Sequence, residues 1–191
     1  MPNPNYKQDS TSSQPSLAAA LRNDESTRNI LSVLVLDLDG IITRVTALFT
    51  RRGYNLISLV SAKTETEGIN RLTIVVDASE YHIEQITKQL HKLVQVLKVV
   101  RLEDDTTIAR SLMLVKVSAD NTNRTQVVDA ASIFRARVVD VSPESVVIEA
   151  TGVPSKLRAF LDVMETFGVR ELVQSGQVAL NRGPKTFAPS K

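Results

Sequence analysis

The stretch LSVLVLDLDGIITRVTALFTRRGYNLISL, residues 31–59, decides the fold of this chain. It opens with an apolar run at 31–36, which is the length of a strand and too short for a buried helix. After the turn Asp37-Leu38-Asp39-Gly40, apolar residues recur at the spacing of one helix face, at Ile41, Ile42, Val45, Leu48 and Phe49. Gly53 is placed to end this helix, and a second apolar strand begins at Asn55. The pattern predicts a strand, a turn, a helix and a strand in succession.

The turn at Asp37 to Gly40 is the candidate binding site. Backbone N–H groups at a helix start have no intrahelical acceptor, and they attract carboxylates and phosphates. Here they belong to Gly40, Ile41 and Ile42, and Gly40 has no Cβ to obstruct an approaching anion. We therefore expect a ligand with an anionic group at this turn.

The composition is that of an ordinary globular protein and excludes several classes of function. The 191 residues are 42% hydrophobic and 23% charged. A net charge of +2, an aromatic content of 4% and the absence of Trp argue against a nucleic-acid partner. The chain has no Cys, which excludes disulfides and thiolate sites and fits a cytoplasmic protein. No apolar run approaches the roughly 20 residues of a membrane-spanning helix, so no membrane partner is expected.

The amino-terminal part predicts a tail followed by one α+β domain. Residues 1–28 are polar and contain prolines, which is typical of a disordered tail. Residues 29–105 predict strands and helices in the order βαββαβ, with strands at 31–36, 55–63, 69–76 and 96–102 and helices at 41–52 and 80–93. This order is ferredoxin-like: an antiparallel four-stranded sheet with both helices on one face.

Residues 109–183 repeat this pattern with little sequence identity. Strands are expected at 111–117, 136–141, 145–150, 169–173 and 178–180, with helices at 124–134 and from Pro154 to a stop at Gly168. We therefore predict a second ferredoxin-like domain with an antiparallel sheet, joined to the first near 103–109. Residues 184–191 are expected to form a loose tail.

Complete catalytic and metal-binding patterns are missing from the sequence. It contains no G-x-G-x-x-G, no G-x-x-x-x-G-K-[ST] and no G-x-S-x-G motif. His82 and His91 fall on opposite faces of one predicted helix, so they cannot share a metal ion. We expect no catalytic residue and no metal site.

One catalytic alternative remains open at the same turn. An apolar strand followed by Asp37-Leu38-Asp39-Gly40 resembles the first motif of the haloacid dehalogenase phosphatases. That resemblance gives Asp37 the role of nucleophile and Asp39 that of acid and base, with both holding magnesium and Asp104-Asp105 as a later motif. Against it, the phosphatase fold needs a parallel sheet, whereas the short connection between 55–63 and 69–76 implies antiparallel pairing.

Most of the chain is similar to another family, the small regulatory subunits of acetolactate synthase, also called acetohydroxyacid synthase. The matching words occur in order through both predicted domains: RGYNLISL at 52–59, EQITKQLHKL at 84–93, LMLVKV at 112–117, IFRARVVDVSPES at 133–145, TG followed by KLRAF within 151–160, FGVRELVQSG at 167–176 and LNRG at 180–183.

This resemblance implies that the first domain is an effector-binding ACT domain and that the chain works through a partner. In this family the large catalytic subunit binds thiamine diphosphate, Mg and FAD and joins two pyruvates into acetolactate and CO2, at the start of valine, leucine and isoleucine biosynthesis. The small subunit binds none of these cofactors. It activates the large subunit and confers feedback inhibition by valine.

The resemblance also implies an effector site at the interface of an ACT homodimer. Its expected residues are Asp37, Asp39, Gly40, Ile41, Ile42, Asn55 and Leu56. The helix N–H groups suit the carboxylate of an amino acid, and Asp37, or Asn55 of the partner subunit, suits the ammonium group. The sequence departs from many family members at Asp37, where they carry Asn, so the choice of effector is less determined than the fold.

Overall fold

The computed structural model describes residues 28–184 and 186–188. Within this range the first domain consists of β1 (Arg28–Leu36), α2 (Ile41–Arg52), β2 (Asn55–Lys63), β3 (Ile69–Asp77), α3 (Glu80–Leu90) and β4 (Val96–Leu102). The predicted tail at 1–28 lies outside the described residues except for Arg28, which is the first residue of β1. The predicted βαββαβ order is confirmed.

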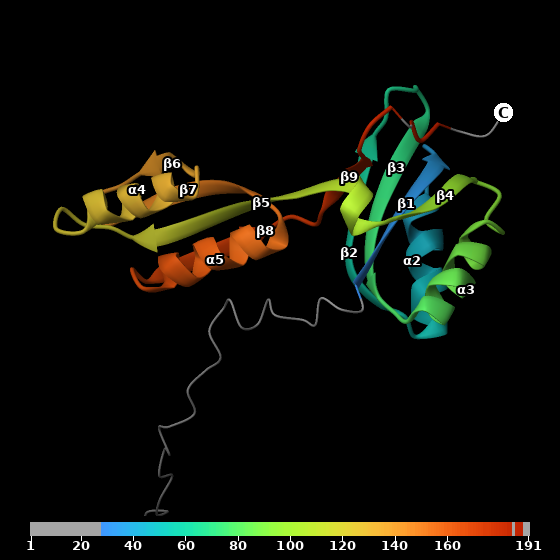
Figure 1. The fold of residues 1–191 in the computed structure, drawn as a ribbon, viewed down its shortest axis with the longest axis horizontal. Coiled ribbons are helices and arrows are strands. Elements are labelled where there is room, and N and C mark those ends of the chain that lie inside the picture. Colours follow the sequence, from blue (N-terminus) through green and yellow to red (C-terminus); the bar gives the residue numbers. More distant parts are fainter. Residues whose placement is uncertain (1–27, 185, 189–191) are drawn as a thin grey trace, which may run out of the picture.

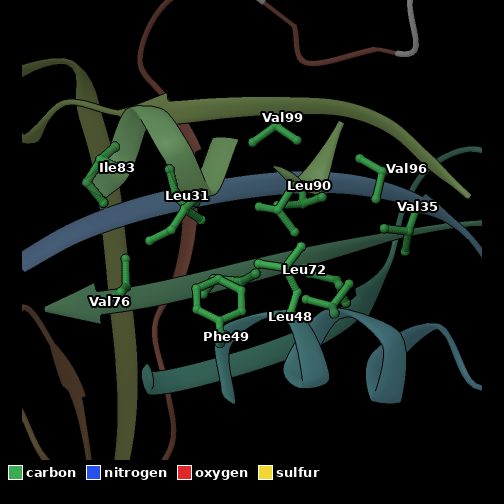
Figure 2. Packing of buried hydrophobic residues seen from close by; sticks show 14 of the residues in the cluster. Leu31, Val35, Leu48, Phe49, Leu72, Val76, Ile83, Leu90, Val96 and Val99 are labelled. Carbon is green, nitrogen blue, oxygen red and sulfur yellow. The ribbon is translucent and has the colours of Figure 1, made fainter. Parts of the chain in front are cut away.

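The first domain is an antiparallel sheet in the order β2-β3-β1-β4, with α2 and α3 on one face (Figure 1). β1 is central because it is apolar on both faces, and its residues from Asn29 to Val35 are all buried. The helices contribute Phe49 and Leu90 to the core beneath β1, where they lie close to Leu31 and Leu72 (Figure 2). This packing fixes α2 so that it starts directly beyond the end of β1.

The second domain has the same architecture. It contains β5 (Thr107–Ser118), α4 (Arg124–Ile133), β6 (Arg137–Val141), β7 (Ser145–Gly152), α5 (Pro154–Glu165) and β8 (Val169–Gln174). Its antiparallel sheet has the order β6-β7-β5-β8, and a separate core forms around Phe160 and Met113. Two ferredoxin-like domains, as predicted from the sequence, are therefore present.

The connection between the domains contains regular structure. The segment predicted to join them, near 103–109, forms a short 3-10 turn (Asp104–Thr106) and the first residues of β5. These first residues of β5 pair with β9 (Val178–Asn181), so β9 joins the five-stranded second sheet through β5, with which it forms a two-stranded ribbon (Figure 1). A single 12-residue strand, β5, thus belongs to the ribbon and to the second sheet.

The ribbon lies against the face of the first sheet that carries no helices. Ala179 of β9 packs with Ile30, Val75 and Leu102 in a small third core. Part of the segment expected as a loose tail, 186–188, also reaches this sheet, because the Phe187 ring lies 5.4 Å from the charged groups of both Arg71 and Lys98. The first sheet is therefore covered on both faces within one chain.

Smaller differences concern element ends and length. α3 ends at Leu90 rather than at residue 93, because 91–94 fold into turns that direct the chain into β4. Among the described residues, no helix is long and apolar enough to cross a membrane.

Candidate functional site

The segment from Asp37 to Ile42, which we call the effector turn, links the end of β1 to the start of α2. Its conformation depends on Gly40, the N-cap of α2, whose φ of 76° lies in the left-handed region that favours glycine. Within the described part of the chain, no side chain caps this helix. Apart from the chain neighbours of Gly40, no atom of those residues would lie within 4 Å of a Cβ built on it, so the approach to the helix start is open.

Hydrogen bonds to the β2–β3 connection and to the start of β3 hold the turn in place. The Asp37 amide donates to the Gly68 carbonyl at 2.8 Å, and the Asn70 side-chain amide donates to Asp37 Oδ1 at 2.7 Å. Asn70 pairs with Val35 across β1 and β3, and this register places its side chain next to Asp37. Sequence reasoning missed Asn70, because only the pairing of β1 with β3 brings it there.

The amides at the start of α2 are partly unused. The Ile41 amide donates to Leu38 at 3.3 Å, a long bond, and the Arg44 amide donates to Gly40 at 3.0 Å. Among the backbone hydrogen bonds of the described residues, the amides of Gly40 and Ile42 have no acceptor. Two donors at a helix N-terminus suit a carboxylate, as the sequence predicts.

The apolar side of the turn differs from the expectation. Ile41 is only 5% exposed and belongs to the core of the first domain, so its side chain is not available to a ligand. Ile42 and Leu38 are instead exposed, by 44% and 53%. Leu38 was not among the expected site residues, although its place inside the D-L-D-G turn is a signal for exposure.

Asn55 and Leu56 lie far from the effector turn in the same chain. Asn55 begins β2 and pairs with Asp77, whereas the effector turn lies beyond the other end of the sheet, next to Asn70 and Lys63. The eight-residue offset along β2 amounts to about 26 Å at roughly 3.3 Å per residue. Leu56 is half-buried against the first core. One chain therefore brings Asp37, Asp39, Gly40 and Ile42 together but not Asn55 and Leu56.

The arrangement does not suit the phosphatase alternative. The pairings of β1 with β3 and β4 are antiparallel, so the parallel sheet that the phosphatase fold requires is not formed. Asp104 follows β4 at the Ile30 end of β1, while Asp37 lies beyond the Leu36 end. Across 28–184 and 186–188, no group of three or more acidic, His or Cys side chains could hold a metal ion.

Comparisons with known proteins agree on one family. Residues 31–98 match the family described as AHAS small subunit-like ACT domain, and residues 110–183 match the small subunit of acetolactate synthase. The chain is 51% identical over 161 residues to the acetolactate synthase small subunit of Mycolicibacterium smegmatis, covering 84% of this chain and 95% of the relative. It is 56% identical over 155 residues to that of Mycobacterium leprae, covering 81% and 92%.

A solved structure supports the same relationship. The crystal structure of the acetolactate synthase small subunit from Thermotoga maritima is 36% identical and superposes with a TM-score of 0.77. The match covers 83% of this chain and 99% of that one. The superposed region includes both domains, which are also the domains over which the sequence resembles this family.

Proposed function

Because this chain belongs to the acetolactate synthase small-subunit family, we propose that it activates a large catalytic subunit and makes it sensitive to valine. In this proposal the large subunit carries thiamine diphosphate, Mg and FAD and converts two pyruvates to acetolactate and CO2 in the cytoplasm. The small subunit supplies the effector site and no catalytic group. The observation that carries the proposal is the effector turn, with its open, uncapped helix start beside Asp37.

An ACT homodimer supplies the part of the site that one chain lacks. β2 is an edge strand of the first sheet, so its outer backbone groups are free to pair with a second copy. Two-fold pairing of β2 with β2 is antiparallel. It therefore carries Asn55 of the partner subunit to the sheet end where the effector turn lies. The proposed site lies at this dimer interface.

The chemistry of valine matches the groups at the interface. The amides of Gly40 and Ile42 donate to its carboxylate, since they lie at a helix N-terminus and have no acceptor among the backbone hydrogen bonds of the described residues. Asp37, and the side-chain oxygen of Asn55 of the partner subunit, accept from its ammonium group. The exposed side chains of Leu38 and Ile42 contact its isopropyl group. Leu56 follows Asn55 on β2 and packs against the first core of its own subunit, so it helps to hold that end of the strand in place.

Binding at a dimer interface gives a physical route to feedback control. Valine that contacts both copies stabilises one relative arrangement of the two ACT domains over others. The large subunit then experiences that arrangement through the docked small subunits. The size of the effect is limited by the difference in valine affinity between the two arrangements.

Reconstitution with the large subunit tests the proposal. Acetolactate formation is measured with the large subunit alone, with this chain added, and with this chain plus valine over a concentration series. The proposal predicts a rise in kcat on addition of the chain and a loss of that rise as valine is added. Unchanged turnover on addition of the chain would contradict it.

A further inference from the structure

A cavity lies between the two domains, away from the effector turn. It has a volume of 310 Å³ and is bounded by the start of β1, the β5–β9 ribbon and the start of α5. α5 begins at the end of the second domain that faces the first (Figure 1). The cavity is therefore walled by both domains and by the ribbon that joins them.

The walls of this interdomain cavity are predominantly cationic. Three arginines line it: Arg28 of β1, Arg110 of β5, and Arg182 next to the end of β9. One carboxylate, that of Asp104, lines it as well. Pro154 and Ser155, the first two residues of α5, also line the cavity, which places the positive end of the helix dipole at its wall. Val153 is the N-cap of α5 and has no side-chain group that accepts from the free amides.

Among the described residues, two polar groups in these walls are buried and have no hydrogen-bond partner. Thr107 is 6% exposed and lines the cavity, and its hydroxyl makes no hydrogen bond within that part of the chain. Arg28 Nε is likewise buried and has no acceptor there. A buried donor that makes no hydrogen bond costs free energy, so such a group in a native protein points to a partner that binds there. Both groups can donate a hydrogen bond, so each has room for an acceptor.

We propose that the interdomain cavity binds a small oxyanion carrying two negative charges, of the phosphate or phosphomonoester class. Three arginines against one aspartate leave an excess of two positive charges, which such an anion neutralises. Arg28 and Arg182 supply charge, Thr107 supplies a hydroxyl donor, and the Ser155 amide at the start of α5 supplies a backbone donor. The bound anion joins the first domain to the start of α5 and holds the two domains together.

Equilibrium dialysis of the full chain with labelled phosphate tests this assignment. Ionic strength is held constant with chloride, and inorganic phosphate is compared with glycerol 3-phosphate to separate a free phosphate from a phosphomonoester. The variants Thr107→Val and Arg182→Gln each remove one donor group from the cavity. Arg137→Gln is the matched control, because it removes the same charge from β6, outside the cavity.

The expected result is saturable binding of one anion per chain, weakened about tenfold or more by Thr107→Val and by Arg182→Gln. Arg137→Gln leaves the affinity unchanged. Thermal unfolding without phosphate checks that each variant is folded, and Arg182→Gln carries the test if Thr107→Val is not. Absence of saturable binding of both anions, or equal affinity in Arg182→Gln and the control, would overturn the proposal.

Discussion

At Gly40, the backbone conformation and the chemistry of the effector turn depend on the same missing Cβ. The φ of 76° places Gly40 at the start of α2, where its amide and that of Ile42 have no acceptor among the backbone hydrogen bonds of the described residues. The open space beside Gly40 leaves room for a ligand carboxylate. An L-residue here meets strain from the backbone as well as filling that space.

Gly40→Asp is predicted to abolish valine inhibition while activation of the large subunit persists. The new carboxylate repels the valine carboxylate and competes for the same amides. Loss of two charge-assisted hydrogen bonds, at roughly 1.5–3 kcal/mol each, corresponds to about a hundredfold or greater loss of affinity. The measurement is a valine titration of the reconstituted enzyme.

Gly40→Ala is the control for backbone strain. It carries the left-handed penalty of about 1–2 kcal/mol without the added charge. We expect the Gly40→Ala chain to be less stable than wild type. The enzyme reconstituted with it is still inhibited by valine, at a higher valine concentration than wild type requires. Full valine sensitivity in Gly40→Asp would place the effector site elsewhere.

Asp120 provides a pH-dependent contribution at the start of α4. Its carboxylate accepts hydrogen bonds from the Thr122 hydroxyl at 2.6 Å and the Thr122 amide at 2.7 Å. These bonds hold the pKa of Asp120 below its usual value, and the bond from the Thr122 hydroxyl has the larger effect. A carboxyl with a lowered folded-state pKa stabilises the fold above its unfolded pKa, about 3.9, and this stabilisation is lost as pH falls through the folded value.

Asp120→Asn is therefore predicted to lower the melting temperature at pH 7, with the difference from wild type shrinking as pH falls below about 4. Asp129→Asn is the matched control, since Asp129 is exposed on α4, the helix that follows Asp120. Thermal unfolding over pH 2 to 7 measures both. A deficit in Asp120→Asn that stays constant across this range would contradict the assignment.

Among the elements, the segment after β8 holds the second domain against the first sheet. A Cβ on Gly176 would lie 2.6 Å from Val60 Cγ2 and 3.1 Å from Ser58, both on β2. Approach this close is compatible only with glycine unless β2 or the segment shifts. The contact therefore fixes how β2 and the β5–β9 ribbon lie together.

Gly176→Ala is predicted to lower the free energy of unfolding by about 1–3 kcal/mol through overpacking. Val60→Ala removes the obstructing methyl group, so the double variant is expected to be more stable than the sum of the two single losses implies. Urea unfolding of the four proteins completes the cycle. Additive losses would show that the Val60 methyl does not limit the site.

Sequence patterns predicted the elements well and their partners less well. Periodicity placed α2 and β2 with their observed ends, because an apolar face and a stop at Gly53 are local signals. It could not show that β9 pairs with the first residues of β5, because ladder pairing depends on chain topology. Likewise, Ile41 and Ile42 look alike in sequence, but one turns into the core and the other outward.

At the scale of the whole molecule, the covered and uncovered parts of the first sheet determine how copies can associate. The helices take one face and the β5–β9 ribbon the other, which leaves the edge strands β2 and β4. In the proposed homodimer, pairing through β2 satisfies its outer backbone groups and completes the proposed effector site. We therefore predict a dimer at micromolar concentration. Sedimentation of a monomer, with and without valine, would contradict this.

We predict that each effector site combines the effector turn of one subunit with Asn55 of the partner subunit. Gly40→Asp and Asn55→Ala then damage different halves of a site. In a mixed dimer with one variant in each subunit, one site receives both changes and the other receives neither. Matched homodimers of each variant serve as controls, and different tags allow the mixed dimer to be purified.

The decisive measurement is labelled-valine binding to this mixed dimer by equilibrium dialysis. We expect one site per mixed dimer with wild-type affinity, although the Gly40→Asp homodimer has no such site and the Asn55→Ala homodimer binds valine more weakly than wild type. If both residues served a site within one chain, every site in the mixed dimer would carry a change. Absence of any wild-type-affinity site in the mixed dimer would contradict the shared site.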